Sequence, residues 1–218
     1  MNKEWSGLNK TMQLQLKKKE SFDDGRKTLF DLRNKLIEAL YDLRGELRRA
    51  DFDALPFPNA NGYHSKTIAY SIWHIFRIED IVAHTLIQGD EQVFFAGSYQ
   101  KRIGSPIITT GNELTGEQIS DFSRQLDLEE LYQYMAEVKN GTEAIVRSLD
   151  FAGLKRKMTE KDKDRLKPLH VVSTDESAAW LIDYWGGKDV RGLIQMPFSR
   201  HWIMHIEASI RIRNKVTA

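Results

Sequence analysis

The chain contains no cysteine, although it is 218 residues long. Disulfide bonds, thiolate metal ligands and a cysteine nucleophile are therefore excluded, and a reducing compartment is favoured. Any metal ion bound by this protein must be held by imidazole, carboxylate or water. The candidate ligands are thereby narrowed to histidine, aspartate and glutamate.

Long apolar runs and an excess of charge of one sign are also missing. No stretch approaches the ~18–20 apolar residues that cross a bilayer. The first 20 residues lack the apolar segment of a secretory signal. Basic and acidic residues number 32 and 31, so the net charge is only +1. We therefore expect a soluble, cytoplasmic protein with no nucleic-acid partner and no membrane partner.

One basic stretch, LKRKMTEKDKDRLKPLH over residues 154–170, raises nucleic-acid binding as an alternative. Glu160, Asp162 and Asp164 are interleaved with its basic residues, and no glycine-rich or aromatic pattern accompanies them. A solvated connection is the favoured interpretation of this stretch.

Apolar residues at helical spacing are what the chain does contain. Its 41% hydrophobic and 29% charged residues are typical of a globular domain. Steps of three and four between apolar residues predict four long helices, over about 21–50, 66–88, 127–149 and 197–214. We interpret residues 1–20 as a polar lead-in, either a solvated tail or a short helix, with the tail favoured. Residues 21–218 then form a single helical-bundle domain.

Capping residues mark several of the predicted helix ends. Ser65 is the expected N-cap of the second long helix, and Asp127 with Glu130 resembles a capping box before the third. Ser173 and Glu176 predict another capping box before a short aromatic helix. Residues 91–125 show no sustained period and are predicted to be mostly loop, with a short helix over Thr115–Phe122.

Four long helices without a convincing strand pair predict an all-α fold, specifically a four-helix bundle. The connection between the third and fourth helices has about 45 residues, which is more than an up-and-down bundle needs. Connections of this length are often functional. We expect this one to be partly helical and to cover one end of the bundle.

Three histidines suggest a metal site. His201 and His205 are four residues apart in PFSRHWIMHIEAS, so they share one face of a helix. His74, in AYSIWHIFRIED, lies at the border of the apolar face of another helix. Convergence of the three would bind a divalent transition metal with positions left open. Spacing alone leaves surface or packing histidines as the alternative.

The other titratable and aromatic candidates each have two interpretations. Arg77 either binds an anionic group or forms a surface salt bridge with Asp80 or Glu79, and the salt bridge is favoured. Glu79 is either a hydrogen-bond partner of a ligand histidine or part of an ion pair between helices. Trp180, Tyr184 and Trp185 either wall a pocket or belong to the core. We expect the remaining histidines to be solvated or locally hydrogen-bonded, namely His64, His84 and His170.

The segment WHIFRIEDIVAH, followed much later by HWIMH, resembles the DinB/YfiT-like superfamily of four-helix-bundle metalloenzymes. The resemblance extends over about residues 21–214. It implies a three-histidine site for a divalent transition metal (Zn, Ni, Fe, Mn or Co), with His74 in the second helix and His201 and His205 in the fourth. It also implies a homodimer.

The resemblance further implies an enzyme that acts on a small molecule. Members of the superfamily include S-transferases that use bacillithiol or mycothiol, a mycothiol-dependent maleylpyruvate isomerase and amidohydrolase-like proteins. A thiol-dependent S-transferase, with a low-molecular-weight thiol as co-substrate, or a hydrolase is therefore expected, and its catalytic residues remain unassigned. The alternative is a non-enzymatic, stress-linked helical dimer whose metal site is structural or vestigial. The connection before the last helix is longer than is usual in the superfamily.

Overall fold

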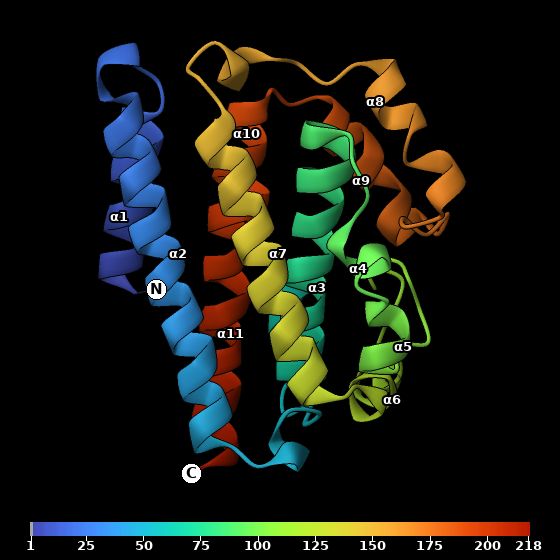
Figure 1. Cartoon of the computed structure of the whole chain (residues 1–218). Coiled ribbons are helices and arrows are strands. Elements are labelled where there is room, and N and C mark those ends of the chain that lie inside the picture. Colours follow the sequence, from blue (N-terminus) through green and yellow to red (C-terminus); the bar gives the residue numbers. More distant parts are fainter. Residues whose placement is uncertain (1) are drawn as a thin grey trace.

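Helices form all the long elements of the computed structural model, which describes residues 2–218 (Figure 1). The four longest segments lie side by side and are α2 (Phe22–Glu46), α3 (Ile68–Asp80) with its π-helical continuation Ile81–Gln88, α7 (Leu128–Ser148) and α11 (His201–Val216). Across residues 2–218 the only β pairing is an isolated bridge between Lys157 and Asp189. The predicted all-α class is confirmed.

The leucine stripe of α2 shows how the sequence places these helices. Its leucines at steps of three and four are all at most 1% exposed, and they are Leu29, Leu32, Leu36, Leu40 and Leu43. The helix ends at Glu46 rather than near residue 50. Asp127 caps α7 as predicted, because its carboxylate accepts a hydrogen bond from the N–H of Glu130. The Glu130 side chain instead pairs with Arg102, so the reciprocal bond of a capping box is missing.

The helix α3 is buried on every side, which a one-sided apolar stripe does not predict. Every residue from Ile68 to Asp80 is buried, because α7, α11 and the segment before α6 cover it. Its N-cap is Thr67 rather than the predicted Ser65, since the Thr67 hydroxyl accepts from the N–H of Tyr70 at 3.1 Å. Ser65 ends a separate 3₁₀ turn. Gly89, with φ of 80°, closes the π-helical continuation.

The preferred interpretation of residues 1–20 as a solvated tail is wrong. Lys3–Gln15 form helix α1, which lies along α2 (Figure 1). Three buried apolar residues anchor it, namely Trp5, Met12 and Leu16, and the half-buried Leu8 also packs against the core. Gly25 of α2 makes room for this contact, because a Cβ there would lie 2.7 Å from a methyl carbon of Leu16. Anchors this sparse in a polar segment give too weak a period to recognise.

Replacing Gly7 by alanine tests this helix. Gly7 lies in the interior of α1, and an added Cβ would meet no atom within 4 Å. Alanine there should raise the free energy of unfolding by about 0.5–1 kcal/mol, because it has the higher helix propensity. Urea denaturation measures the change. Gly25→Ala is the opposite control and should destabilise, and no effect at Gly7 would mean that α1 does not form in solution.

Short helices replace much of the loop predicted for residues 91–125. They are α4 (Val93–Ala96), α5 (Tyr99–Ile103) and α6 (Glu117–Gln125). Each is too short to show a reliable period. A buried carboxylate holds α4 in place, because Asp80 accepts hydrogen bonds at 2.9 Å from the N–H groups of Val93 and Phe94. The short helix expected at Thr115 begins at Glu117 and ends three residues later than predicted, at Gln125.

The connection between α7 and α11 contains α8 (Glu160–Asp164), α9 (Glu176–Gly186) and α10 (Val190–Gln195). In Figure 1, α8 and α9 lie to one side of the bundle, beside the upper part of α3. Asp175 caps α9 by accepting from the N–H of Ser177 at 2.8 Å, so the capping box predicted at Ser173 is wrong.

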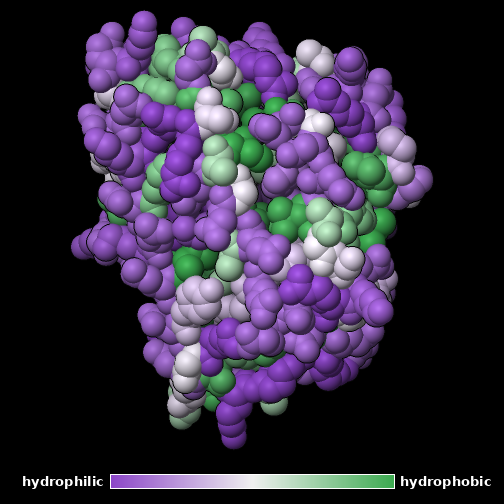
Figure 2. All heavy atoms as spheres, viewed as in Figure 1, coloured by the Kyte–Doolittle hydropathy of each residue, from purple (hydrophilic) through white to green (hydrophobic). Residues whose placement is uncertain are grey.

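The basic stretch over residues 154–170 is packed rather than solvated. Leu154, Met158 and Leu166 are buried in it. Asp162 is also buried, and its two carboxylate oxygens pair with Arg156 and Arg165. The apolar residues within the charged run therefore anchor it to the bundle. Over the view of Figure 2 the surface is mostly hydrophilic, and none of the described helices is both long and apolar enough to cross a bilayer.

Candidate metal centre

Two of the three candidate ligands come from the start of α11. His201 and His205 leave the same face one turn apart, and their ring centroids are 4.6 Å apart. A π-helical segment, Met196–Arg200, precedes them and contains Pro197. The carbonyl of Phe198 in this segment accepts a hydrogen bond from Arg33 at 3.0 Å. The π-helical segment is thus tied to α2.

His74, the third candidate ligand, comes from α3 and is held in one orientation. Its Nδ1 lies 2.7 Å from the carbonyl oxygen of Thr110. Because a carbonyl only accepts, Nδ1 carries the proton and Nε2 keeps its lone pair for a ligand. The turn that supplies this carbonyl continues through Gly111, whose φ is 76° and whose own carbonyl accepts from the Tyr70 hydroxyl at 2.9 Å.

The three imidazoles converge as the sequence predicted. One ring nitrogen from each lies within 4.8 Å of the other two, and the three side chains belong to buried residues. The centroid of the His74 ring is 5.0 Å from that of His201 and 4.9 Å from that of His205. Two nitrogens that bind one zinc ion at about 2.0–2.1 Å lie at most about 4.2 Å apart. Small ring rotations therefore suffice for the cluster to hold a divalent transition ion.

The environment keeps these histidines neutral. Burial lowers the pKa of His74 to about 4, although its bond to the Thr110 carbonyl works in the opposite direction. Burial also lowers the pKa values of His201 and His205 well below the usual range, and the neighbouring imidazoles add to the effect. A neutral imidazole is the form that binds a metal. The Nδ1 atoms of His201 and His205 are buried without a hydrogen-bond partner in the described chain, which leaves them free for a ligand.

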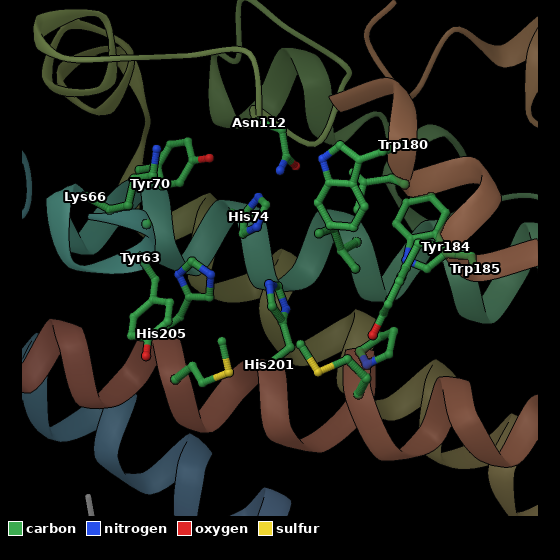
Figure 3. Close-up of a pocket in the computed structure, with 16 residues that line it drawn as sticks. Tyr63, Lys66, Tyr70, His74, Asn112, Trp180, Tyr184, Trp185, His201 and His205 are labelled. Carbon is green, nitrogen blue, oxygen red and sulfur yellow. The ribbon is translucent and has the colours of Figure 1, made fainter. Parts of the chain in front are cut away.

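The cluster opens into a cavity of about 460 Å³ between α3, α9 and α11. Figure 3 shows the three histidines pointing toward one another, with Lys66 and Tyr63 at one end and Trp180 and Tyr184 at the other. The pocket-wall interpretation of these two aromatics is thus confirmed. Trp185 serves both roles, since it lines the cavity and is only 1% exposed.

The favoured salt bridge of Arg77 with Asp80 is present, but it is buried rather than on the surface, because the Arg77 side chain is completely buried. The guanidinium donates to the carbonyl of Ile108 at 2.7 and 3.2 Å and pairs with Asp80 at 3.5 Å. It lines neither the surface nor the cavity of the histidines. It instead fastens the segment before α6 onto α3, close to the Thr110 carbonyl that orients His74.

Glu79 forms an ion pair between helices and does not contact a ligand histidine. Its carboxylate accepts from Arg33 of α2 at 2.7 Å and from the indole N–H of Trp202 at 2.8 Å. Trp202 follows His201 directly in α11. The Glu79 carboxylate therefore connects α2, α3 and α11 beneath the candidate metal centre.

The other histidines lie outside the cluster. His84 is locally hydrogen-bonded as expected, with Nδ1 2.8 Å from a carboxylate oxygen of Asp90. His170 is exposed, in a left-handed conformation with φ of 51°. His64 is half-buried against the Tyr63 ring, and it helps to lower the pKa of His205.

Sequence reasoning missed Lys66, Thr110 and Asn112. Lys66 and Asn112 line the cavity, and Thr110 orients His74. All three lie in turns of the structure, although Lys66 was predicted to begin the second long helix. The TTGN sequence could have indicated a turn, but no spacing rule could show that this turn faces α3.

The metal-free protein should lose stability as the pH falls from about 6.5 to about 4. The unfolded chain binds a proton at His74 near pH 6.5, whereas the folded chain does so only near pH 4. Acid therefore favours the unfolded chain across this window, by about 3 kcal/mol from His74 alone. Urea unfolding of chelator-treated protein at several pH values measures this, and His74→Leu should flatten the dependence. Equal slopes for both proteins would contradict the assignment.

These observations define an all-helical protein with a buried three-histidine cluster at an aromatic-walled cavity. No family model matches the sequence, and no curated protein matches it. A crystal structure of a conserved protein from Enterococcus faecalis is similar, with a TM-score of 0.60 and 12% sequence identity. The match covers 85% of this chain and 92% of the Enterococcus chain. At this identity the similarity shows the fold alone.

Proposed function

We propose that the chain is a metal-dependent enzyme of the DinB/YfiT-like superfamily, acting on a small molecule with its centre at His74, His201 and His205. The observation that carries the proposal is the convergence of three buried, neutral imidazoles on one cavity. The placement of these histidines on the second and fourth of four long helices supports the superfamily, which the sequence resembles.

A divalent ion held by three imidazoles supplies open positions at which the pKa of a bound water or thiol is lowered. The chain's own residues prepare the surroundings. Thr110 fixes the tautomer of His74, and the aromatic walls restrict water around the cluster. The protein has no cysteine, so a reacting thiol must belong to a co-substrate.

The cavity wall favours thiol transfer over hydrolysis. No aspartate or glutamate of the described chain lines the cavity, so a carboxylate general base is missing there. A free thiol has a pKa of about 8.5, whereas bulk water has a pKa of about 15.7, so a bound ion would have to lower the pKa of water much further than that of a thiol. A nucleophile that ionises readily suits a site without a base. We therefore place a thiol-dependent S-transferase ahead of a hydrolase.

Metal analysis of protein purified without an affinity tag tests the proposal. We expect about one divalent ion per chain by mass spectrometry, and d–d bands of a Co²⁺-substituted sample that shift when a low-molecular-weight thiol is added. Protein that binds no transition ion would contradict the enzyme proposal. A bound ion whose spectrum ignores every small ligand would favour the alternative of a structural site in a non-enzymatic helical protein. Light scattering measures the homodimer that the superfamily resemblance implies.

A further inference from the structure

Lys66 is a cation without an acidic partner at one end of the cavity. It lies just before α3 and is half-buried, and its ammonium stands 4.9 Å from the centre of the Tyr70 ring. No carboxylate of residues 2–218 lies within 4.0 Å of it. By contrast, Lys35, Lys139 and Lys163 each pair with a glutamate. Burial lowers the pKa of Lys66, and no acidic neighbour opposes this effect. The fold therefore holds a partly desolvated positive charge uncompensated.

The rest of the cavity offers nothing that would balance this charge. Among the described lining residues Lys66 is the only lysine, and no arginine, aspartate or glutamate accompanies it. The carboxylate of Glu113 lies near Tyr70, but it bonds to the Thr109 hydroxyl and does not line the cavity. A divalent ion on the histidines would add more positive charge. A ligand that enters must therefore bring the negative charge itself.

The opposite end of the cavity is apolar and flat. Trp180 is 51% exposed, which is unusual for so large an apolar side chain. Its indole N–H donates to the carbonyl of Ser177 at 2.8 Å. The N–H is therefore already used, and a ligand can contact the faces of the ring. The Tyr184 ring meets it edge to face, with centroids 5.6 Å apart. Figure 3 shows this aromatic pair and Lys66 on opposite sides of the histidines.

We propose that the cavity binds small carboxylates with a flat apolar body, the carboxylate at Lys66 and the body against Trp180 and Tyr184, so that the atoms between them lie over the three imidazoles. The substrate class of the proposed enzyme follows from this arrangement, and to that extent the inference rests on the proposed function. Lys66 determines specificity for charge, and Trp180 determines specificity for shape.

Two probes of matched shape test the proposal, namely 2-naphthoate and its neutral amide, 2-naphthamide. Isothermal titration calorimetry measures both with the full chain, before and after removal of metal. We expect naphthoate to bind at least about tenfold more tightly than the amide, even without metal, since a bond to a partly buried charge contributes that much. Lys66→Met should abolish the preference, and Lys66→Arg should keep it. Trp180→Ala should weaken both probes by a similar factor.

Lys18→Met is the matched control, because Lys18 is an exposed lysine far from the cavity, and it should keep the full preference. Circular dichroism verifies that each variant folds. Equal affinity of the two probes for metal-free protein would overturn the inference, as would an unchanged preference in Lys66→Met or no binding of either probe. A preference that appears only with Zn²⁺ would assign anion binding to the metal alone, against Lys66. Failure of the protein to bind metal would contradict the enzyme proposal, but the comparison of naphthoate with naphthamide on metal-free protein would still test the inference.

Discussion

Replacing Arg33 by methionine should lower the free energy of unfolding by about 3–5 kcal/mol, because it leaves the buried carboxylate of Glu79 without its cation. Glu143 keeps its pairs with Lys139 and Arg147. Arg33 is 1% exposed and pairs with Glu79 at 2.7 Å and with Glu143 at 3.3 Å. Burial alone would lower the pKa of Arg33, but these carboxylates outweigh it and raise the pKa. Domains are stable by only about 5–15 kcal/mol, so a large part of the total is at stake.

The same substitution should also weaken metal binding. Arg33 donates to the Phe198 carbonyl, and Glu79 accepts from the Trp202 indole, on either side of His201. The guanidinium carbon of Arg33 also lies over the Trp202 ring, 4.2 Å from its centroid. Loss of these contacts releases the start of α11, which carries His201. Loss of a direct hydrogen-bond partner of a metal ligand lowers metal affinity about 10–100-fold, so this indirect effect should be about tenfold or less. Arg33→Lys keeps the positive charge but loses the two-pronged set of N–H donors, so its effects should lie between those of the unchanged protein and Arg33→Met.

Urea denaturation and metal titration of the Arg33 variants measure the two effects. Arg44→Met is the control, because Arg44 lies in the same helix and forms an exposed ion pair with Glu129. A surface pair of this kind contributes about 0–1 kcal/mol. If Arg33→Met were as mild as Arg44→Met, the buried ion pairs would not stabilise the fold as described.

His201→Ala and His205→Ala should each reduce the affinity for a divalent ion by roughly 10²–10³-fold. Four-ligand structural zinc sites bind with about 10–16 kcal/mol, so one ligand contributes on the order of 3–4 kcal/mol. Both side chains are buried with one ring nitrogen within 4.8 Å of the others. Competition titration against a metal-binding dye measures the affinity, and circular dichroism shows whether each variant folds.

His170→Asn is the control for these two variants. His170 is exposed and adopts a left-handed conformation that asparagine tolerates, so the exchange should leave both fold and affinity unchanged. Equal affinity in His205→Ala and His170→Asn would show that His205 is not a ligand. A loss of affinity in His170→Asn would place the metal elsewhere on the chain.

Periodicity predicted the long helices because each carries an apolar face that tertiary contacts then bury. Periodicity did not predict burial on a helix that is covered on every side rather than on one face. On α3 the charged side chains of Arg77, Glu79 and Asp80 are fully buried. Arg77 and Asp80 pair with each other within the helix, and Glu79 pairs with Arg33, which is distant in sequence. The polar helix α1 was not predicted because a few apolar residues anchor it, which is too few to form a clear period.

The histidine cluster could be predicted from the sequence because the spacing of two of its members is a local feature of one helix. The spacing of His201 and His205 is fixed by the helix, and the border position of His74 made convergence reasonable. What surrounds the cluster depends on turns. The Thr110 carbonyl and the Lys66 ammonium reach it from turns whose positions follow from the packed fold rather than from any sequence period.

The π-helical segment Met196–Arg200 makes the site sensitive to chain length. A π turn holds one residue more than an α turn, so this stretch amounts to a single-residue insertion within a helix. Deleting one residue from it would leave the HWIMH sequence intact. It would, however, close the π turn to an α turn and would move the Phe198 carbonyl away from Arg33. In this stretch, a change in residue number should therefore be tolerated less well than a change in residue type.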